Sequence, residues 1–134
     1  MSKRILVASF AAFTFFGAFN VPAALAAGPK SFLASVDKDN DGTVSLDEVK
    51  AYASARFQAL ETDKDGTLDA KELKGRLSAR GFKAANADAD KTIDEAEFLA
   101  YVEKLFKEAN DNDDTLDAKE LGTPAGRKLI KLLK

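Results

Sequence analysis

The chain contains neither cysteine nor histidine, and its only methionine is Met1. Without cysteine, no disulfide can stabilise a small exported domain. Without both residue types, any metal site must use oxygen ligands, which zinc and copper do not prefer. The common histidine-dependent acid–base and nucleophilic schemes are also excluded, and no other nucleophile–base pair stands out. The sequence therefore argues against an enzyme.

The first residues have the features of a secretory signal peptide. Ser2 to Arg4 is a positively charged start, Ile5 to Phe19 is almost entirely apolar, and Ala24 to Ala26 is an A-x-A cleavage signal. The alternative is a transmembrane anchor, but the apolar run is shorter than the about 20 residues that a spanning helix needs. We expect residues 1–26 to be removed on export to the periplasm. Residues 27–134 would then form one small domain without stable membrane insertion.

The charge balance argues against a nucleic-acid partner. The formal net charge is −2, and loss of Lys3 and Arg4 with the signal peptide would bring it to about −4. Nucleic-acid binding needs a basic face, which this balance does not favour. The sequence does not identify a protein partner.

The stretch DKDNDGTVSLDE places three aspartates within five residues. Carboxylates so close together repel one another unless a cation lies between them. The stretch matches the EF-hand calcium loop, D-x-[DN]-x-[DN]-G-x5-E, at every position, with Gly42 at the sharp turn. A chance match of this kind is improbable, which argues against a merely solvated acidic turn. The expected ligands of this first loop (residues 37–48) are Asp37, Asp39, Asp41, Thr43, Ser45 and Glu48.

Loop two (residues 61–72), ETDKDGTLDAKE, repeats the pattern with one departure. Glu61 replaces aspartate at position one, so its carboxylate must reach the ion through one extra methylene. If it does, the loop offers five carboxylates, which favours a more highly charged ion. The expected ligands are Glu61, Asp63, Asp65, Thr67, Asp69 and Glu72.

Loop three (residues 86–97), NADADKTIDEAE, has lysine at the glycine position. A non-glycine residue can adopt the left-handed backbone there, at a cost of roughly 1–2 kcal/mol. The positive charge of Lys91 also lies near the expected ion, so we predict weakened binding. The expected ligands are Asn86, Asp88, Asp90, Thr92, Asp94 and Glu97.

Loop four (residues 109–120), ANDNDDTLDAKE, departs furthest from the pattern. Ala109 offers no side-chain oxygen at position one, and Asp114 replaces the glycine. We predict a weak or lost metal site, or a relic that serves only to pair with another loop. Its remaining candidate ligands are Asp111, Asp113, Thr115, Asp117 and Glu120.

The spacing of the loops predicts an all-α fold. The loops begin at residues 37, 61, 86 and 109, which leaves 11 to 13 residues between one loop and the next. Two helices and a linker do not fit there, so one shared helix of about 17–20 Å should connect each pair of consecutive loops. We expect a compact three-helix bundle with four EF-hand loops joined by these short shared helices.

Along two of the connecting segments, apolar residues recur every three or four residues, which is typical of an amphipathic helix and supports this arrangement. The first segment carries Leu46, Val49, Ala53, Phe57 and Leu60, and the last carries Phe98, Tyr101, Val102, Leu105 and Phe106. The middle segment is weaker and is interrupted by Gly75 and Gly81. Phe32 is expected to end a short turn before loop one. Thr123 and Pro124 predict the start of a C-terminal amphipathic helix that covers the bundle, although a membrane-surface or partner role is the alternative.

An apolar residue occupies position eight of every loop. In EF hands this residue forms the short antiparallel contact between two paired loops. Four copies predict two pairs, which would explain why a degraded loop is kept. The four residues are Val44, Leu68, Ile93 and Leu116.

The loop spacing, the signal peptide and the four loops together resemble the lanmodulin family, periplasmic EF-hand proteins that bind lanthanides. The resemblance is strongest over DKDGTLDAKELKGR, from Asp63 to Arg76, and continues through FKEANDNDDTLDAKEL and GTPAGRKLIKLLK. It implies a three-helix bundle with metals at its periphery and a disorder-to-order change on metal binding. It also implies an acidic residue at position nine, as at Asp69, Asp94 and Asp117.

We therefore expect a non-enzymatic periplasmic protein that binds Ca²⁺ and/or lanthanide(III) ions and folds when it binds them. Its role would be metal trafficking or buffering. Hard oxygen ligands suit Ca²⁺, and a trivalent ion of similar size attracts the same carboxylates more strongly. The alternative is a calcium sensor that binds a protein partner when metal-loaded. The absence of methionine after Met1 argues against the adaptable methionine-rich surface of such sensors.

Overall fold

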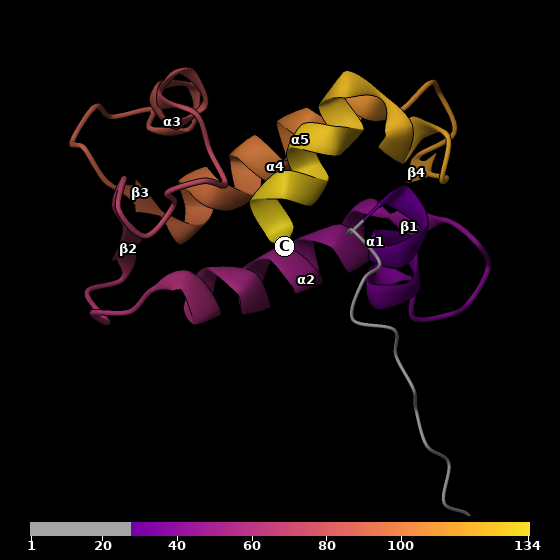
Figure 1. Ribbon diagram of the computed structural model, residues 1–134, viewed down its shortest axis with the longest axis horizontal. Helices are drawn as coiled ribbons and strands as arrows, with labels where there is room; N and C mark the ends of the chain where they lie inside the picture. The colour runs from indigo at the N-terminus through magenta and orange to yellow at the C-terminus, as the bar shows by residue number, and fades with distance from the viewer. Residues whose placement is uncertain (1–27) are drawn as a thin grey trace, which may run out of the picture.

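The computed structural model describes residues 28–134, so the expected signal peptide, residues 1–26, lies outside the described residues. The described part is mostly helical, as Figure 1 shows, and the predicted all-α class is confirmed. No helix within it is both long enough and apolar enough to cross a membrane.

The elements alternate between helices and very short strands. The helices are α1 (Pro29–Val36), α2 (Leu46–Leu60), α3 (Ala79–Ala85), α4 (Glu95–Ala109), η1 (Glu120–Gly122, a 3-10 turn) and α5 (Pro124–Leu133). The strands are β1 (Val44–Ser45), β2 (Thr67–Leu68), β3 (Ile93–Asp94) and β4 (Thr115–Leu116).

Helices α2 and α4 are two of the connecting helices that the spacing predicts. Each contains 15 residues, which corresponds to about 22 Å. Both begin with a capping box, formed by Ser45 with Glu48 in α2 and by Asp94 with Glu97 in α4. The box satisfies backbone N–H groups that the first helical turn leaves without partners. Residues of the loops therefore also start the helices that leave them.

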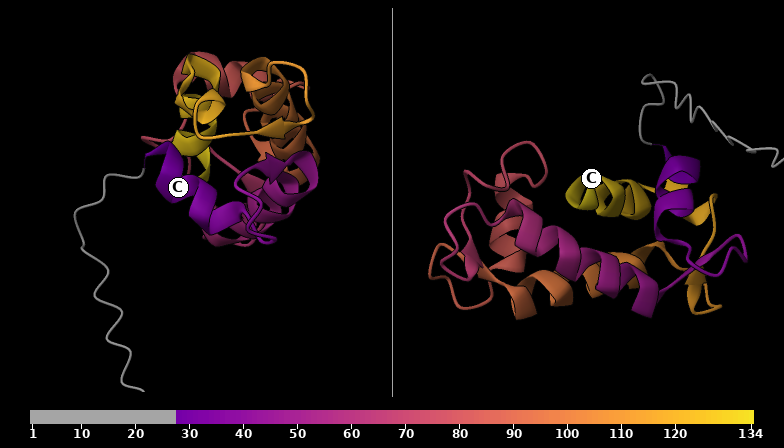
Figure 2. Two further views of the ribbon diagram at one scale, coloured as in Figure 1. Left: turned by 90° about the vertical axis from the view of Figure 1, so that its right-hand side faces the viewer. Right: turned by 90° about the horizontal axis from the view of Figure 1, so that it is seen from below.

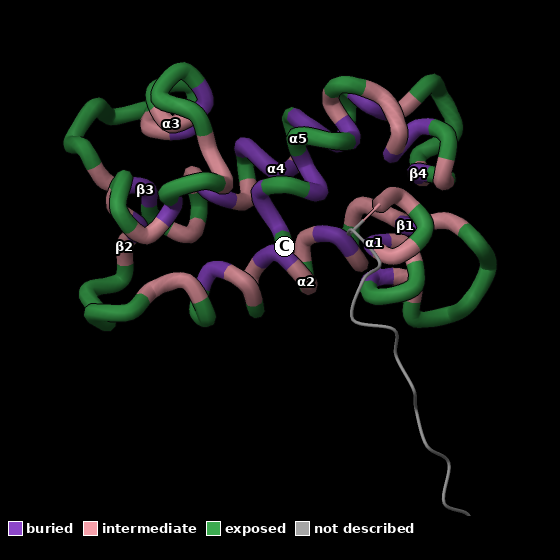
Figure 3. Tube along the Cα trace, in the orientation of Figure 1, coloured by how far each residue is buried: buried purple, intermediate pink, exposed green. Residues whose placement is uncertain are grey.

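The apolar stripes of these helices form the core, as predicted. All five residues of the α4 stripe are buried, and Val49, Ala53 and Phe57 of α2 are buried opposite them. The rings of Phe57 and Phe98 meet edge to face, with centroids 5.6 Å apart. Figure 3 shows the consequence: the buried residues lie along the helices, and the loops at both ends are mostly exposed.

Helix α5 is the predicted C-terminal helix. The Thr123 hydroxyl accepts a hydrogen bond from the Gly126 N–H at 3.1 Å, and Pro124 follows it at the first helical position. Its apolar face is buried against α4, which also packs on α2. Viewed end-on in Figure 2, α2, α4 and α5 gather around the core. The predicted role of α5 in covering the core is confirmed.

The prediction of a middle connecting helix is wrong. Residues 70–76 form turns instead, and only the short α3 follows before loop three. Gly75 adopts a φ of +81°, which a helix does not allow, and Ser78 then caps α3 by accepting from the Gly81 N–H at 3.1 Å. The chain therefore turns back rather than crossing the molecule. The third helix beside α2 and α4 is α5.

The turn back determines which loops pair. Val44 of loop one pairs with Leu116 of loop four, and Leu68 of loop two pairs with Ile93 of loop three, both antiparallel. The predicted contacts between position-eight residues are confirmed. In Figure 1 one pair lies at each end of the long axis, with α2 and α4 running between them.

Candidate metal centres

The glutamate at position twelve closes every loop in the same way. In loop one, the Lys38 N–H donates to Glu48 Oε1 and the Ser45 N–H to Glu48 Oε2, each at 2.9 Å. These bonds, from Ser45 first and then Lys38, lower the pKa of Glu48. The carboxylate is therefore held in its charged form between positions two and nine. The equivalent donor–glutamate sets are Thr62 and Asp69 on Glu72, Ala87 and Asp94 on Glu97, and Asp111 and Asp117 on Glu120.

The aspartate at position five is oriented by the threonine at position seven. Both the N–H and the hydroxyl of Thr43 donate to Asp41 Oδ1 at 2.8 Å. From the sequence, these threonines were predicted only as carbonyl ligands, and their side-chain role was missed. Hydroxyls two residues after an aspartate were the available signal. The same pair of bonds joins Thr67 to Asp65, Thr92 to Asp90 and Thr115 to Asp113.

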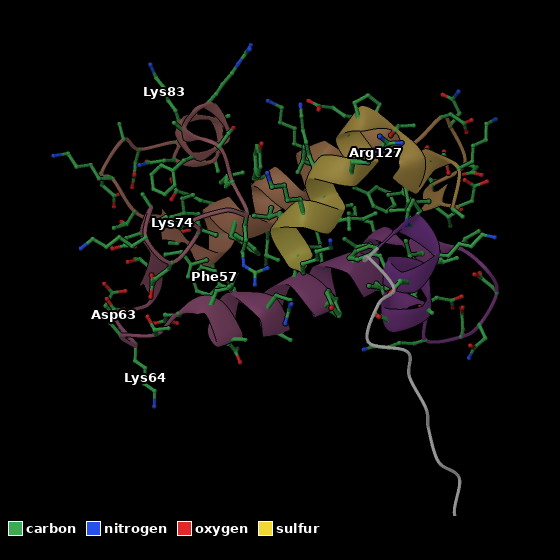
Figure 4. All side chains as sticks on the ribbon, viewed as in Figure 1. Phe57, Asp63, Lys64, Lys74, Lys83 and Arg127 are labelled. Carbon is green, nitrogen blue, oxygen red and sulfur yellow. The ribbon has the colours of Figure 1, made fainter. Side chains whose placement is uncertain are left out.

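Three loops bring carboxylate oxygens together. Within residues 28–134, three groups of three carboxylates have oxygen atoms within 4.8 Å of one another. The groups are Asp37, Asp39 and Glu48 in loop one, Glu61, Asp63 and Asp65 in loop two, and Asp111, Asp113 and Glu120 in loop four. In Figure 4, Asp63 lies at the outer tip of loop two.

Glu61 reaches the interior of loop two despite its longer side chain. Its carboxylate accepts a hydrogen bond from the Gly66 N–H, as Asp37 accepts from the Gly42 N–H in loop one. Both glycines have left-handed backbones, with φ of +89° at Gly42 and +87° at Gly66. The Glu61 carboxylate therefore lies in one close group with those of Asp63 and Asp65.

Neighbouring carboxylates in loops one and two repel one another, as the sequence predicts. A backbone hydrogen bond from Asp41 lowers the pKa of Asp39, but desolvation and the Asp41 carboxylate raise it overall. In loop two, desolvation and the charges of Asp65 and Glu72 raise the pKa of Asp63. A cation placed among these oxygens would relieve the repulsion.

Loop three makes the same glutamate and threonine hydrogen bonds as the other loops. It does not bring three carboxylates together within 4.8 Å among the described residues. Lys91 adopts the left-handed backbone predicted for it, with φ of +76°. Asn86 ends α3, and its Oδ1 atom is buried without a hydrogen-bond partner in the described part of the chain. The amide oxygen is thus available as a ligand at position one.

Loop four has a ligand candidate that sequence reasoning missed. Ala109 is the last residue of α4 and is buried, and Asn110 occupies the place held by Asp37 in loop one. Like Asp37, Asn110 donates its N–H to the helix carbonyl four residues earlier. Asp111 then makes the bond to Glu120 that Lys38 makes to Glu48, across nine residues rather than ten. The loop is therefore one residue shorter than the aligned pattern suggests.

The Asn110 side chain also bridges loop four internally. Its Oδ1 accepts from the N–H groups of Asn112 at 2.7 Å and Asp113 at 3.2 Å. Its Nδ2 donates to the carbonyl oxygen of Thr115 at 3.0 Å, the atom predicted to bind metal from position seven. An amide thus makes contacts here that an ion would otherwise make.

The comparison with protein families agrees with the geometry of the first two loops. Residues 30–51 and 55–78 match the family model described as EF hand, and these segments contain loops one and two. Two segments of the chain carry an EF-hand signature. A search of curated proteins finds no match. The matches and the grouped carboxylates together support binding of a calcium-type cation.

Proposed function

We propose that this protein is a non-enzymatic binder of hard cations, Ca²⁺ and/or lanthanide(III), that acts in the periplasm in metal trafficking or buffering. The observation that carries the proposal is the shared geometry of loops one and two. In each loop, three carboxylates have oxygen atoms within 4.8 Å of one another. The position-twelve glutamate of each loop accepts hydrogen bonds from the backbone N–H groups at positions two and nine. Oxygen-only donor sets of this kind suit hard cations.

Binding in this account is coupled to folding. The described chain has a small core, and its position-eight residues join loops that are distant in sequence. Small domains without disulfides are marginally stable. An ion that binds only the ordered loops would stabilise the paired ends, and α2 and α4 would pack between them.

Loop two is the proposed principal site for a trivalent ion. Its five carboxylates come from Glu61, Asp63, Asp65, Asp69 and Glu72, whereas loop one has the neutral Ser45 at position nine. The Coulomb attraction of each carboxylate scales with the charge of the ion, so the fifth charge favours a lanthanide more than it favours calcium. Loop one is then the more calcium-tolerant site.

Loops three and four are proposed as weaker sites. Loop three carries Lys91 and forms no close carboxylate group within the described residues. In loop four the neutral Asn110 replaces a charged ligand and engages Thr115. Their main contribution is to pair with loops two and one.

A competitive titration of metal-free protein with Ca²⁺ and La³⁺, in chelator-buffered solutions, tests the proposal. We expect saturable binding of both ions, with La³⁺ tighter. Asp69→Ser should lower La³⁺ affinity by a larger factor than Ca²⁺ affinity. Serine preserves the cap, because Ser45 Oγ accepts from the Glu48 N–H as Asp69 Oδ1 accepts from the Glu72 N–H. No saturable binding of either ion would refute the proposal, and equal losses would refute the assignment of loop two.

A further inference from the structure

A cavity lies between the turn before α3, α3 itself, α4 and α5. Its volume is about 630 Å³, within the range of about 300–1,000 Å³ typical of sites for small organic ligands. None of the candidate metal ligands lines it. The cavity is therefore separate from the metal centres.

The lining of the cavity is basic, although the whole chain has a net negative charge. Five cationic side chains line it, against the single carboxylate of Glu108; they are Arg76, Arg80, Lys104, Lys128 and Lys131. The described residues contain two ion pairs, and both join lysines outside this lining to Glu103. Arg76 donates to a main-chain oxygen of Lys134, and the other four cations have no carboxylate partner within residues 28–134. Five cations against one carboxylate favour an anionic ligand.

Part of the lining is apolar. It comprises Leu105, which is buried, Leu77, which is partly buried, and Ala84, which is exposed, beside Tyr101. The Tyr101 hydroxyl makes no hydrogen bond in the described structure, and burial followed by the nearby Glu108 charge raises its pKa. The hydroxyl therefore stays protonated and is available to donate. An inorganic ion would leave the apolar side chains of the lining without a contact.

We propose that this cavity binds a small organic anion with an apolar body. The acidic group of this ligand lies among four cations, Arg80, Lys104, Lys128 and Lys131. Its apolar body contacts Leu105 and Leu77. The Tyr101 hydroxyl donates a hydrogen bond to the ligand.

The test uses 8-anilino-1-naphthalenesulfonate, a fluorescent apolar anion, with the calcium-saturated protein. The sulfonate is a weak calcium chelator, so metal is not removed from the loops. We expect saturable binding at one site per chain, competed by 1,5-naphthalenedisulfonate but not by the neutral 1-naphthalenemethanol. Equal competition by the charged and the neutral compounds would overturn the assignment of an anion site.

Two matched pairs of charge reversals locate the site. Arg80→Glu and Lys131→Glu alter the lining, whereas Lys83→Glu and Arg127→Glu alter the same two helices outside it. All four side chains are exposed, so the fold should tolerate each change. Figure 4 shows Lys83 pointing outward from α3, and it labels Arg127 on α5.

We expect Arg80→Glu combined with Lys131→Glu to weaken binding at least about tenfold, because it replaces attraction by repulsion next to the acidic group. The combined Lys83→Glu and Arg127→Glu control should change affinity less than about twofold. Tyr101→Phe should weaken binding severalfold and leave the fold intact. Equal effects of the two double variants would overturn the proposal.

A separate calcium titration of the same protein distinguishes failure of this inference from failure of the metal-binding proposal. Charge-selective binding at the cavity in calcium supports the anion site whether or not the loops prefer lanthanide. A protein that binds calcium but shows no saturable, charge-selective probe binding overturns the anion site alone.

Discussion

Val44 and Leu116 pair across an antiparallel contact although they belong to the first and last loops of the chain. Both side chains are completely buried. Loop one is therefore supported by loop four, and loop two by loop three in the same way through Leu68 and Ile93. The four loops act as two structural units, one at each end of α2 and α4.

This pairing predicts that a substitution in one loop lowers the calcium affinity of the loop with which it pairs. Leu116→Ala should destabilise the protein by about 2–5 kcal/mol and weaken calcium binding at loop one. Ile93→Ala should instead weaken binding at loop two. Amide resonances of Gly42 and Gly66, followed by NMR during calcium titration, report the two loops separately. Equal weakening at both glycines in either variant would contradict the paired arrangement.

Loop four should gain affinity when Asn110 is replaced by aspartate. Asn110→Asp removes the amide donor to Thr115 and adds a negative charge beside Asp111 and Glu120. We expect calcium to bind loop four at least severalfold more tightly, because each added carboxylate strengthens the attraction. The control is Asn112→Asp, which adds the same charge at an exposed position whose backbone N–H, but not its side chain, is bonded to Asn110. If calorimetry gives both variants the same gain, charge alone rather than ligand position explains the effect.

Helix α5 should lose stability when Gly126 is replaced by alanine, even though alanine favours helices. An added Cβ would lie 2.5 Å from the Glu120 carbonyl oxygen and from Leu121 Cα, both backbone atoms. The resulting shift of α5 should cost about 1–3 kcal/mol, measured by urea denaturation. Gly122→Ala is the matched control, since its nearest heavy atom would lie 4.0 Å away, at Pro29. An unchanged midpoint for Gly126→Ala would show that α5 does not dock as described.

An ion-pair cluster that joins α2 to α4 predicts a small stabilisation that depends on pH. Lys107 and Lys50 each lie 2.6 Å from Glu103 and lower its pKa from 4.5 to about 2. Because the folded-state pKa is below the unfolded one, the stabilisation is present above about pH 4.5 and is lost as the pH falls toward about 2. The effect should be modest and sensitive to salt, since the side chains are partly exposed.

Thermal unfolding of wild type and Glu103→Gln across this pH range measures the effect. The difference in Tm should be constant near neutral pH and should disappear by about pH 2. Glu108→Gln, on the same helix but without an ion pair among the described residues, should show no such trend. A wild-type advantage that persists unchanged at the lowest pH would contradict the assigned ion pairs.

Local patterns in the sequence were sufficient to predict α2, α4, α5 and the first two loops. The apolar spacing determines which face of each helix is buried, and the loop pattern places Asp37, Glu61 and Glu48 through short-range hydrogen bonds. Such features depend on neighbouring residues, so periodicity and motif spacing reveal them.

Features that depend on how distant segments meet could not be predicted. Gly75 was recognised as a weak point, but only the backbone conformation shows that the chain reverses there. The sequence predicted two loop pairs without identifying the partners. Aligning loop four by its glutamate assigned position one to Ala109, whereas the end of α4 gives that place to Asn110.

The central claim is that hard cations bind the acidic loops and thereby order the fold, and far-ultraviolet circular dichroism during calcium titration of metal-free protein tests it most directly. We predict a saturable rise in helical signal. Glu48→Gln with Glu72→Gln should shift the rise to higher calcium, and Asp47→Asn, an exposed acid outside the ligand positions, should not. A spectrum equally helical in excess chelator and in saturating calcium or La³⁺ would contradict the account.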